Sequence, residues 1–344
     1  MNGGVGRSSQ EAAVKEIIVL GGYGRVGRQC VNELVETTRA RVVVAGRNIQ
    51  LAERFASEYG ERTRAAYANA ADPRTLQSLI PGAAAVVSCC GSDRLAALDI
   101  AVQTRVAFLG VTPTPLEQRV STRLQEESWQ GQVPVILHAG AIPGLPGVLA
   151  ELLMRRFSSL YEIRIASTGP WSRSELAYRD LQELRQMNDS DGNGTAPDRS
   201  WRWRRLRWQF PEPIGTRLMR PARSLDLRDF VSGHCVDRLL YLEPDTSFIA
   251  RSVQQVLQRE QDTGFALVAE AYPNPGDHRP AERITLQAPD HLRATAAAVG
   301  ALAQRILGGG LVGGFFTPRE ALNPATFLEL LAKRGVQVES ASYS

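Results

Sequence analysis

The chain has 344 residues, 43% of them hydrophobic, which is enough for two domains of a soluble globular protein. Residues 1–15 lack the apolar core of a signal peptide, and no apolar run reaches the ~20 residues of a membrane span, so we expect a disordered lead-in, a cytoplasmic protein and no membrane partner. Only Lys15 and Lys333 among the 40 basic residues are lysines, a compositional bias that does not predict a nucleic-acid partner despite the net charge of +4.

Residues 17–27 form a short apolar run followed by a glycine-rich turn, Ile-Ile-Val-Leu-Gly-Gly-Tyr-Gly-Arg-Val-Gly. Gly22, Gly24 and Gly27 have the spacing of a dinucleotide-binding unit, and a helix is predicted after them. In such a unit Gly22 permits the tight turn, Gly24 lets the backbone approach a pyrophosphate, and Gly27 lets helix and strand pack closely. The phosphates are expected at the positive end of the helix. The alternative is a glycine-rich turn without a ligand.

A second apolar strand, residues 42–45, ends about twenty residues past the last glycine, at Gly46-Arg47. An NAD site normally places Asp or Glu here, and the carboxylate binds the ribose hydroxyls. Arg47 suits the 2′-phosphate of NADP, which a carboxylate would repel. We therefore predict NADP(H) as the cofactor. Arg25 is either a second contact to the phosphate or a solvated surface residue.

Further apolar strands are predicted at residues 64–67, 84–88, 106–109 and 134–138. Helices alternate with them, such as residues 51–59 and residues 73–79, which Asp72 caps. This alternation predicts an α/β fold with a Rossmann-type doubly wound parallel sheet over residues 16–140, and a ligand beyond the carboxyl ends of its strands. The predicted cofactor-binding residues are Gly22, Tyr23, Gly24, Arg25, Val26, Gly27, Gly46, Arg47, Asn48, Asp72, Cys90, Gly91, Thr112 and Gly144.

The turn after the fourth strand, residues 89–93, is expected to border the nicotinamide. Asp93 is a candidate catalytic acid or base there, or else a helix cap. Cys90 is expected to line the pocket or to pack in it, because nothing nearby marks it as a nucleophile. No metal is expected, since no metal-ligand spacing is found among the four cysteines, Cys30, Cys89, Cys90 and Cys235.

Residues 138–147 lead from the last of these strands into an apolar helix, residues 148–157. His138 is the second candidate catalytic residue, because an imidazole suits acid–base work near neutral pH. The alternative is a hydrogen-bonded histidine at a strand end. Pro143-Gly144 opens the helix and is expected to bring backbone N–H groups and the helix dipole near the carboxamide or an anionic substrate.

Residues 141–290 predict longer strands and an α+β domain for substrate binding and dimerisation. In its residues 201–208 tryptophans and arginines interleave, which predicts a strand whose tryptophans a partner subunit covers in part, and therefore a homodimer. The alternatives for this run are a contact to an anionic substrate or to the cofactor and, disfavoured, binding of single-stranded nucleic acid. The candidate substrate contacts in the domain are Tyr178, Arg179, Arg220 and His234.

Residues 291–344 are expected to form C-terminal helices that pack back on the first domain. A helix over residues 291–307 ends at the three glycines that begin at Gly308. A last helix has Asn323 as its cap and Pro324 at its first position, and runs to Arg334.

Residues 21–28 with 45–48, residues 139–147, and residues 313–318 with 323–324 resemble the saccharopine dehydrogenase (saccharopine reductase) family of NADP- or NAD-dependent oxidoreductases. The resemblance implies a Rossmann domain joined to an α+β domain that binds substrate and often dimerises.

Two turns depart from the family's pattern, so saccharopine itself is not the expected substrate. Residues 90–93 are Cys-Gly-Ser-Asp where a Gly-Pro-Phe turn is common, and residues 110–113 are Gly-Val-Thr-Pro where an Asp-x-x-Gly-Glu run is frequent. The Tyr-x-x-x-Lys pair of short-chain dehydrogenases is excluded, because Glu11 and Glu329 stand four residues before the two lysines. We expect an NADP-dependent reductase of a C=N, C=O or C=C bond in a small metabolite. The alternative is an NADP-binding regulatory or assembly protein without turnover.

Overall fold

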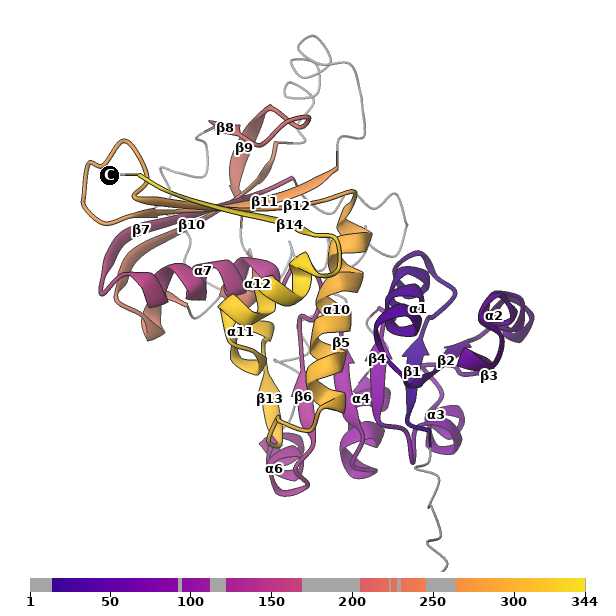
Figure 1. Cartoon of the computed structure of the whole chain (residues 1–344). Coiled ribbons are helices and arrows are strands. Elements are labelled where there is room, and N and C mark those ends of the chain that lie inside the picture. The colour runs from indigo at the N-terminus through magenta and orange to yellow at the C-terminus, as the bar shows by residue number, and fades with distance from the viewer. Residues whose placement is uncertain are drawn as a thin grey trace, which may run out of the picture.

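The computed structural model describes residues 14–91, 95–111, 122–168, 205–222, 224–227, 230–245 and 264–343. In these residues the chain forms two seven-stranded sheets with helices packed on and between them (Figure 1). The predictions made for residues 1–13, Asp93, Thr112, Tyr178, Arg179 and residues 201–204 lie outside this part of the chain.

The first sheet consists of parallel strands only. Its strand order is β13 (Gly314–Phe316), β6 (Pro134–Ile136), β5 (Ala107–Gly110), β4 (Ala85–Ser88), β1 (Glu16–Leu20), β2 (Arg41–Gly46) and β3 (Thr63–Tyr67). The order reverses at β1, so the ligand-binding position of such sheets lies at the carboxyl ends of β1 and β4. The predicted Rossmann-type doubly wound sheet is confirmed.

Helices cover both faces of this sheet, because alternate residues of each strand point to opposite faces. Ile17 and Val19 belong to the hydrophobic cluster on one face, and Ile18 and Leu20 to the cluster on the other. The first face carries α1 (Arg25–Thr37), α2 (Ile49–Ala56) with the 3-10 turn η1 (Ser57–Arg62), and α10 (His291–Leu307). The second face carries α3 (Pro73–Leu79), α4 (Leu95–Gln103) and α6 (Thr122–Gln130).

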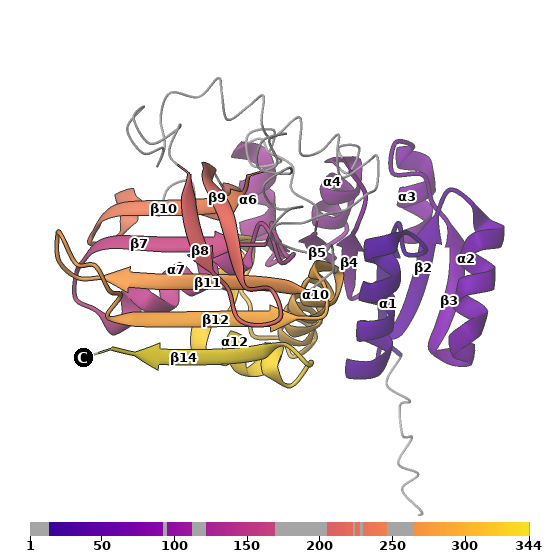
Figure 2. The ribbon, with the colours of Figure 1, turned by 90° about the horizontal axis from the view of Figure 1, so that it is seen from above.

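The second sheet is mixed, with β7 and β10 parallel and every other neighbouring pair antiparallel. Its order is β14 (Gln337–Ser342), β12 (Glu282–Ala288), β11 (Phe265–Tyr272), β7 (Leu160–Ser167), β10 (Val236–Pro244), β9 (Thr216–Ala222) and β8 (Leu206–Gln209). Two 3-10 turns, η4 (Leu225–Leu227) and η5 (Val231–Gly233), precede β10. The helices α7 (Leu145–Arg156) and α12 (Pro324–Ala332) pack under one face of this sheet (Figures 1 and 2).

One hydrophobic cluster joins the two sheets. It extends from Leu34 of α1 through Leu302 of α10 and Leu149 of α7 to Ile165 of β7. The alanine-rich α10 lies beside α1 and faces both domains, and its small side chains allow this close approach (Figures 1 and 2). The second domain is therefore packed directly against the nucleotide domain through α10.

The β8–β9 hairpin lies across the other face of the second sheet (Figure 2). Trp208 of β8 is 7% exposed and packs with Phe210, Ile214 and Met219 in a separate hydrophobic cluster. The expected strand over residues 201–208 is therefore observed only for its end, and its last tryptophan is covered by its own chain. Trp208 thus gives no reason to expect a partner subunit.

The segment after residue 290 contains strands as well as helices, which corrects the expectation of helices alone. β13 pairs with β6 at the end of the first sheet, and β14 pairs with β12 at the edge of the second. The short runs that form them lie between Gly and polar residues and have no helical or strand period long enough to be identified. The short α11 (Pro318–Ala321) follows β13, and Asn323 caps α12 as expected, its Oδ1 accepting the Ala325 N–H at 3.0 Å.

Candidate cofactor and active site

The glycine-rich turn connects β1 to α1 at the point where the strand order reverses. Gly21 has a φ of +76°, and the N–H groups of Gly21 and Gly22 both donate to the carbonyl of Ala45, at 2.8 and 3.2 Å. A Cβ on Gly27 would lie 2.1 Å from the carbonyl oxygen of Gly21. The turn is thus tied to the end of β2, and helix and strand approach so closely that only glycine fits at residue 27.

The first turn of α1 is open to an anion. Its N-cap is Gly24, which provides no side-chain hydrogen bond, and no acidic residue lies in the first turn. The first helical bond runs from the Arg28 N–H to the Gly24 carbonyl, at 2.8 Å, so the N–H groups of residues 25–27 precede it. Gly24 and Arg25 are exposed, whereas Val26 is partly buried against the core. An uncapped positive helix end behind a glycine turn fits the pyrophosphate of a dinucleotide.

Tyr23 fills the place that an acidic side chain takes at the end of β2 in an NAD site. A Cβ on Gly46 would lie 2.3 Å from Cε1 of Tyr23 and 2.8 Å from its Cζ. The phenol oxygen accepts the N–H of Asn48 at 2.9 Å, and the Tyr23 carbonyl accepts the Nε–H of Arg28 at 2.9 Å. Tyr23 is thus bonded at its hydroxyl and at its backbone carbonyl, and residue 46 cannot carry a side chain while the ring stays there.

Arg47 lies exposed just past β2, and it forms no ion pair with any described residue. Its guanidinium is therefore available for a 2′-phosphate. Asn48 caps α2, with its Oδ1 accepting the Leu51 N–H at 3.0 Å. Asp72 caps α3 in the same way, accepting the Arg74 N–H at 3.1 Å beyond the outermost strand β3. Both caps have a structural reason that is independent of a cofactor.

The turn after β4 lies against the glycine turn. A Cβ on Gly21 would be 3.4 Å from the Sγ of Cys90, and the Cys89 N–H donates to the Leu20 carbonyl at 3.0 Å. Gly91 is the last residue of this turn that the structure describes. Cys90 is thus beside the expected pyrophosphate. The cofactor contacts of Cys90 and Gly91 stay predictions. The catalytic role of Asp93 and the cofactor contact of Thr112 concern residues beyond the described ones and stay predictions too.

The segment from His138 to Gly144 folds back on itself at the carboxyl end of β6. A Cβ on Gly144 would lie 2.3 Å from the His138 carbonyl oxygen and 2.4 Å from that of Gly140, so this position requires glycine. The Ala141 N–H donates to Oγ1 of Thr295 in α10 at 3.2 Å, which binds the segment to α10. His138 has a φ of +60° and is 2% exposed. A catalytic role for His138 therefore requires the substrate to reach a buried imidazole.

The positive end of α7 is already occupied by a carboxylate of the chain. Oδ2 of Asp226 accepts the Gly147 N–H at 2.6 Å, its Oδ1 accepts the Ser224 hydroxyl, and Asp226 is 3% exposed. The expectation that the Pro143-Gly144 turn offers this helix end to an anionic substrate is corrected, because Asp226 neutralises it. The partner is 79 residues away in the sequence, so spacing gives no sign of it.

His291 is a candidate site residue that the sequence analysis treated only as the start of a helix. It lies in the first turn of α10 near Arg25, and burial together with the positive charge of Arg25 lowers the pKa of His291 against the opposing effect of Asp290. Glu33 further along α1 meets Gly300 of α10, so the two helices run side by side in the same direction. The imidazole is therefore neutral near pH 7 and lies close to the glycine turn. In the sequence, the Asp-His pair before an alanine-rich helix was the feature from which His291 could have been identified as a candidate.

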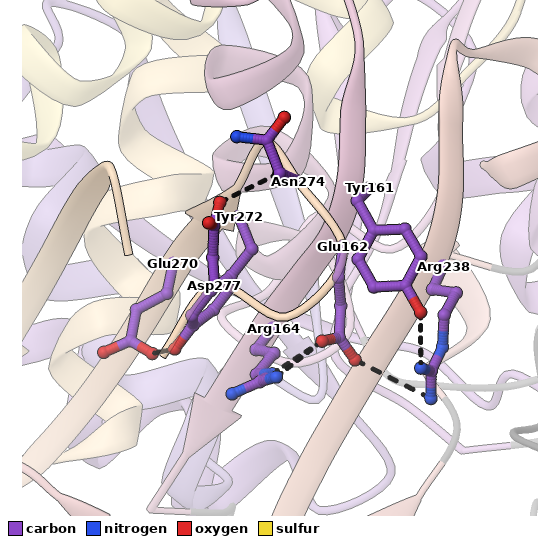
Figure 3. A network of polar contacts seen from close by, with 8 residues as sticks. All are labelled: Tyr161, Glu162, Arg164, Arg238, Glu270, Tyr272, Asn274 and Asp277. Atoms are coloured by element: carbon purple, nitrogen blue, oxygen red, sulfur yellow. Dashed lines mark hydrogen bonds and ion pairs between the residues drawn. The ribbon is translucent and has the colours of Figure 1, made fainter. Parts of the chain in front are cut away.

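A second cluster of charged residues lies on the second sheet (Figure 3). Oε2 of Glu162 accepts two N–H groups of Arg164, at 2.9 and 2.6 Å, and Arg238 approaches Oε1 to 3.9 Å. The Tyr272 hydroxyl donates to Glu270 at 2.7 Å, and burial together with Glu270 raises the pKa of Tyr272. Because arginines neutralise Glu162 and the tyrosine stays protonated, this cluster has a structural role.

The described residues contain no group of three or more His, Cys, Asp or Glu side chains that could hold a metal ion. Within the same residues, no helix has the length and apolar character needed to cross a membrane.

The glycine turn, the uncapped α1 and the parallel sheet define a dinucleotide-binding domain followed by an α+β domain. Residues 17–132 match the family model described as the saccharopine dehydrogenase NADP binding domain, from β1 to just past α6. Over these residues the chain is similar to that domain, and its cofactor is NADP(H). The predicted resemblance and the predicted cofactor are confirmed.

Among solved structures, the apo histidine-tagged saccharopine dehydrogenase (L-Glu forming) from Saccharomyces cerevisiae has a TM-score of 0.66 at 12% identity, covering 96% of this chain and 100% of its own. At this identity the likeness shows the fold, with both domains included. A putative myo-inositol dehydrogenase from Sinorhizobium meliloti 1021 has a TM-score of 0.46 at 12% identity, over 96% of this chain and 100% of its own, which is too low to carry an argument. No curated protein sequence matches the chain.

Proposed function

We propose that the protein is an NADP-dependent oxidoreductase that reduces a C=N, C=O or C=C bond of a small metabolite. The observation that carries the proposal is the arrangement at the end of β2, where Tyr23 closes Gly46 and Arg47 stands exposed beside an uncapped α1. This arrangement belongs to an NADP-binding domain whose neighbouring domain packs through α10 next to the same turn. This arrangement supports the binding of a redox cofactor beside the second domain.

When bound, NADPH supplies a hydride from C4 of its nicotinamide. The N–H groups of residues 25–27 bind the pyrophosphate, and Arg47 binds the 2′-phosphate. Transfer of the hydride to a C=O or C=N carbon leaves an anionic oxygen or nitrogen, which takes one proton. His138 and Asp93 are the proposed proton donors.

The alternative function is binding of NADP by a regulatory or assembly protein without turnover. The rewritten turns at residues 90–93 and 110–113 favour it, because they replace the family's residues next to the nicotinamide. The same turns are the reason that we do not propose saccharopine as the substrate.

The test is NADPH oxidation, followed by absorbance, with a panel of imines, ketones and enones, together with NADPH titration by fluorescence. His138→Ala should lower the turnover by about 10²–10⁴-fold while leaving the NADPH affinity within about twofold. His278→Ala is the matched control, because His278 is exposed on the second domain. NADPH binding without oxidation by any compound would favour the regulatory alternative, and equal turnover of both variants would exclude His138 as the proton donor.

We also propose that the protein is a cytoplasmic homodimer that associates through the second domain. The motive is the concentration of tryptophan and arginine in residues 201–208. Light scattering at micromolar concentration measures the mass, and a monomer would contradict the proposal.

A further inference from the structure

Two cysteines lie close together beside the glycine turn. The Sγ of Cys89, the first residue after β4, is 3.9 Å from the Sγ of Cys30 in α1, and neither residue is in a disulfide. They are 59 residues apart in the sequence, so the fold brings them together. A disulfide has an S–S distance of ~2.05 Å, so the two sulfurs need to approach by about 1.9 Å to form one.

The faces of the first sheet determine which cysteines can pair. Cys30 belongs to the hydrophobic cluster on the face that carries α1, and Cys89 packs against the same cluster. The neighbouring Cys90 packs against the cluster on the opposite face. The fourth cysteine, Cys235, is exposed and directly precedes β10 in the second domain. Cys89, and not Cys90, is therefore the partner of Cys30.

The two thiols of the pair differ in their exposure. The side chain of Cys30 is fully buried, whereas Cys89 is partly exposed. A disulfide dissolved in the solvent therefore reaches Cys89 first, and Cys30 reacts with Cys89 from inside the protein. An accessible thiol with a second thiol next to it is the arrangement of redox-sensitive cysteine pairs.

Both cysteines belong to backbone that packs against the glycine turn. The Cys89 N–H donates to the Leu20 carbonyl at 3.0 Å, and a Cβ on Gly21 would lie 3.5 Å from the Cys89 carbonyl oxygen. Cys30 comes three residues after Gly27 and lies on the same face of α1, where the helix approaches the Gly21 carbonyl too closely to allow a Cβ. Interiors packed this closely transmit a displacement. Drawing the two sulfurs together therefore moves α1 or the turn after β4 against the glycine turn.

We propose that Cys30 and Cys89 form a reversible disulfide that lowers the affinity of the protein for NADP(H). The oxidant is a small dissolved disulfide, such as glutathione disulfide. The Cys89 thiolate attacks one of its sulfurs, which forms a mixed disulfide and releases one glutathione thiolate. The sulfur of Cys30 then displaces the second glutathione from Cys89, and the proton of Cys30 goes to the departing thiolate. Two protein thiols are thus oxidised and one glutathione disulfide is reduced to two thiols, and a dithiol reverses the reaction.

The coupling between the disulfide and the cofactor acts in both directions. If the disulfide lowers the NADPH affinity by a given factor, bound NADPH makes the disulfide harder to form by the same factor. Protein that is loaded with cofactor therefore stays reduced, and protein without cofactor is oxidised more easily. This coupling concerns the binding of the cofactor and holds whether or not the protein turns over a substrate.

The experiment equilibrates the full chain with mixtures of glutathione and glutathione disulfide. Mass spectrometry with peptide mapping identifies the disulfide, and fluorescence titration gives the NADPH affinity. The oxidised wild type should contain the Cys30–Cys89 disulfide and bind NADPH at least about tenfold more weakly, and dithiothreitol should restore the affinity. Cys90→Ser should still form this disulfide, whereas Cys30→Ala and Cys89→Ser should not. Cys235→Ser, at the exposed cysteine of the second domain, is the matched control and should behave as wild type.

A Cys89–Cys90 disulfide in place of the expected one, no disulfide at all, or equal NADPH affinity of the oxidised and reduced forms would overturn the proposal. A loss of affinity only in molecules that carry a glutathione adduct would also overturn it, because the adduct itself would then block the site. If Cys30→Ala does not fold, peptide mapping of the wild type and Cys89→Ser decides the pairing. Saturating NADPH should raise the ratio of glutathione disulfide to glutathione that is needed for half-oxidation, and an unchanged ratio would contradict the coupling.

Discussion

Gly46→Asp installs the carboxylate of an NAD site at the end of β2 and tests whether Tyr23 excludes it. The new Cβ would lie 2.3 Å from Cε1 and 2.9 Å from the hydroxyl oxygen of Tyr23, so the ring or the strand must move. Overpacking of this kind costs about 1–3 kcal/mol. If the ring moves away, the hydrogen bond from the Asn48 N–H is lost, which costs a further ~0.5–1.5 kcal/mol. We expect a less stable protein that does not gain NADH affinity.

The double variant Tyr23→Ala/Gly46→Asp provides the comparison, because removal of the ring opens the space for the carboxylate. Urea denaturation gives the free energy of unfolding, and fluorescence titration gives the affinities for NADPH and NADH. The double variant should lose less free energy of unfolding than the two single variants lose together, which corresponds to a coupling of about 0.5–3 kcal/mol. Its NADH:NADPH preference should rise by at least tenfold, because the carboxylate repels the 2′-phosphate and binds the ribose hydroxyls. Tyr23→Phe, which removes only the hydroxyl, is the matched control.

One result would refute this reasoning. If Gly46→Asp alone binds NADH more tightly than wild type at unchanged stability, the ring of Tyr23 does not close residue 46. The preference for NADP would then depend on Arg47 alone.

Three further predictions concern single residues. Arg47→Met should weaken NADPH binding by roughly 10–150-fold, corresponding to about 1.5–3 kcal/mol for a charge-assisted bond, and leave NADH binding unchanged in a titration; equal losses would exclude a contact to the 2′-phosphate. Gly24→Val should abolish NADPH binding with the thermal midpoint nearly unchanged, because its Cβ meets only the Gly21 carbonyl at 3.1 Å while its branches occupy the place of the pyrophosphate; retained affinity would contradict the assignment. Gly300→Ala should lower the free energy of unfolding by about 1–3 kcal/mol, because its Cβ would lie 2.7 Å from Glu33, whereas Gly233→Ala, with open space around it, should be neutral; equal effects would contradict the close helix packing.

The sequence predicts the nucleotide domain well because its signals are local. The glycine spacing, the apolar strands and the missing carboxylate at Gly46 all lie within one βαβ unit, and each has a direct steric or electrostatic meaning. The helix over residues 291–307 was predictable for the same reason, since alanine content, an Asp cap and the following glycines define it. Signals that end within a dozen residues are independent of the rest of the fold.

The remaining features of the site depend on residues that are far apart in the chain. Asp226 neutralises the start of α7 from another segment, and the ring of Tyr23 reaches β2 across the turn. A pocket between α7 and α11 brings together Glu151, His234 and Arg319, which are far apart in the sequence. Such contacts follow from the packing of two sheets through α10, and no periodicity of the sequence contains that packing.

Glu33 and Arg334 form a buried ion pair where the C-terminal helices meet α1. The Glu33 Oε1 and Arg334 Nε are 3.0 Å apart, and their side chains are 2% and 5% exposed. Arg334 also donates to the Leu330 carbonyl at 2.9 Å and to Gln304 at 2.7 Å, so the pair connects α1, α10 and α12. Burial raises the pKa of Glu33, although Arg334 opposes this effect.

Arg334→Met should therefore destabilise the protein in a pH-dependent way. Without its partner the Glu33 carboxylate is buried and uncompensated, which costs about 3–5 kcal/mol near pH 8. The folded-state pKa of Glu33 lies above its unfolded value, so the folded chain binds the proton more tightly; the contribution of Glu33 to stability is greatest below the unfolded pKa and is lost as the pH rises through the folded one. Removal of Arg334 raises the folded pKa further, and the loss measured by urea denaturation should be smaller at pH 5 than at pH 8. Glu33→Gln/Arg334→Met removes both charges and should show little of this pH dependence. An equal loss at both pH values in the single variant would mean that Arg334 acts through its hydrogen bonds to α10 and α12 rather than through the charge of Glu33.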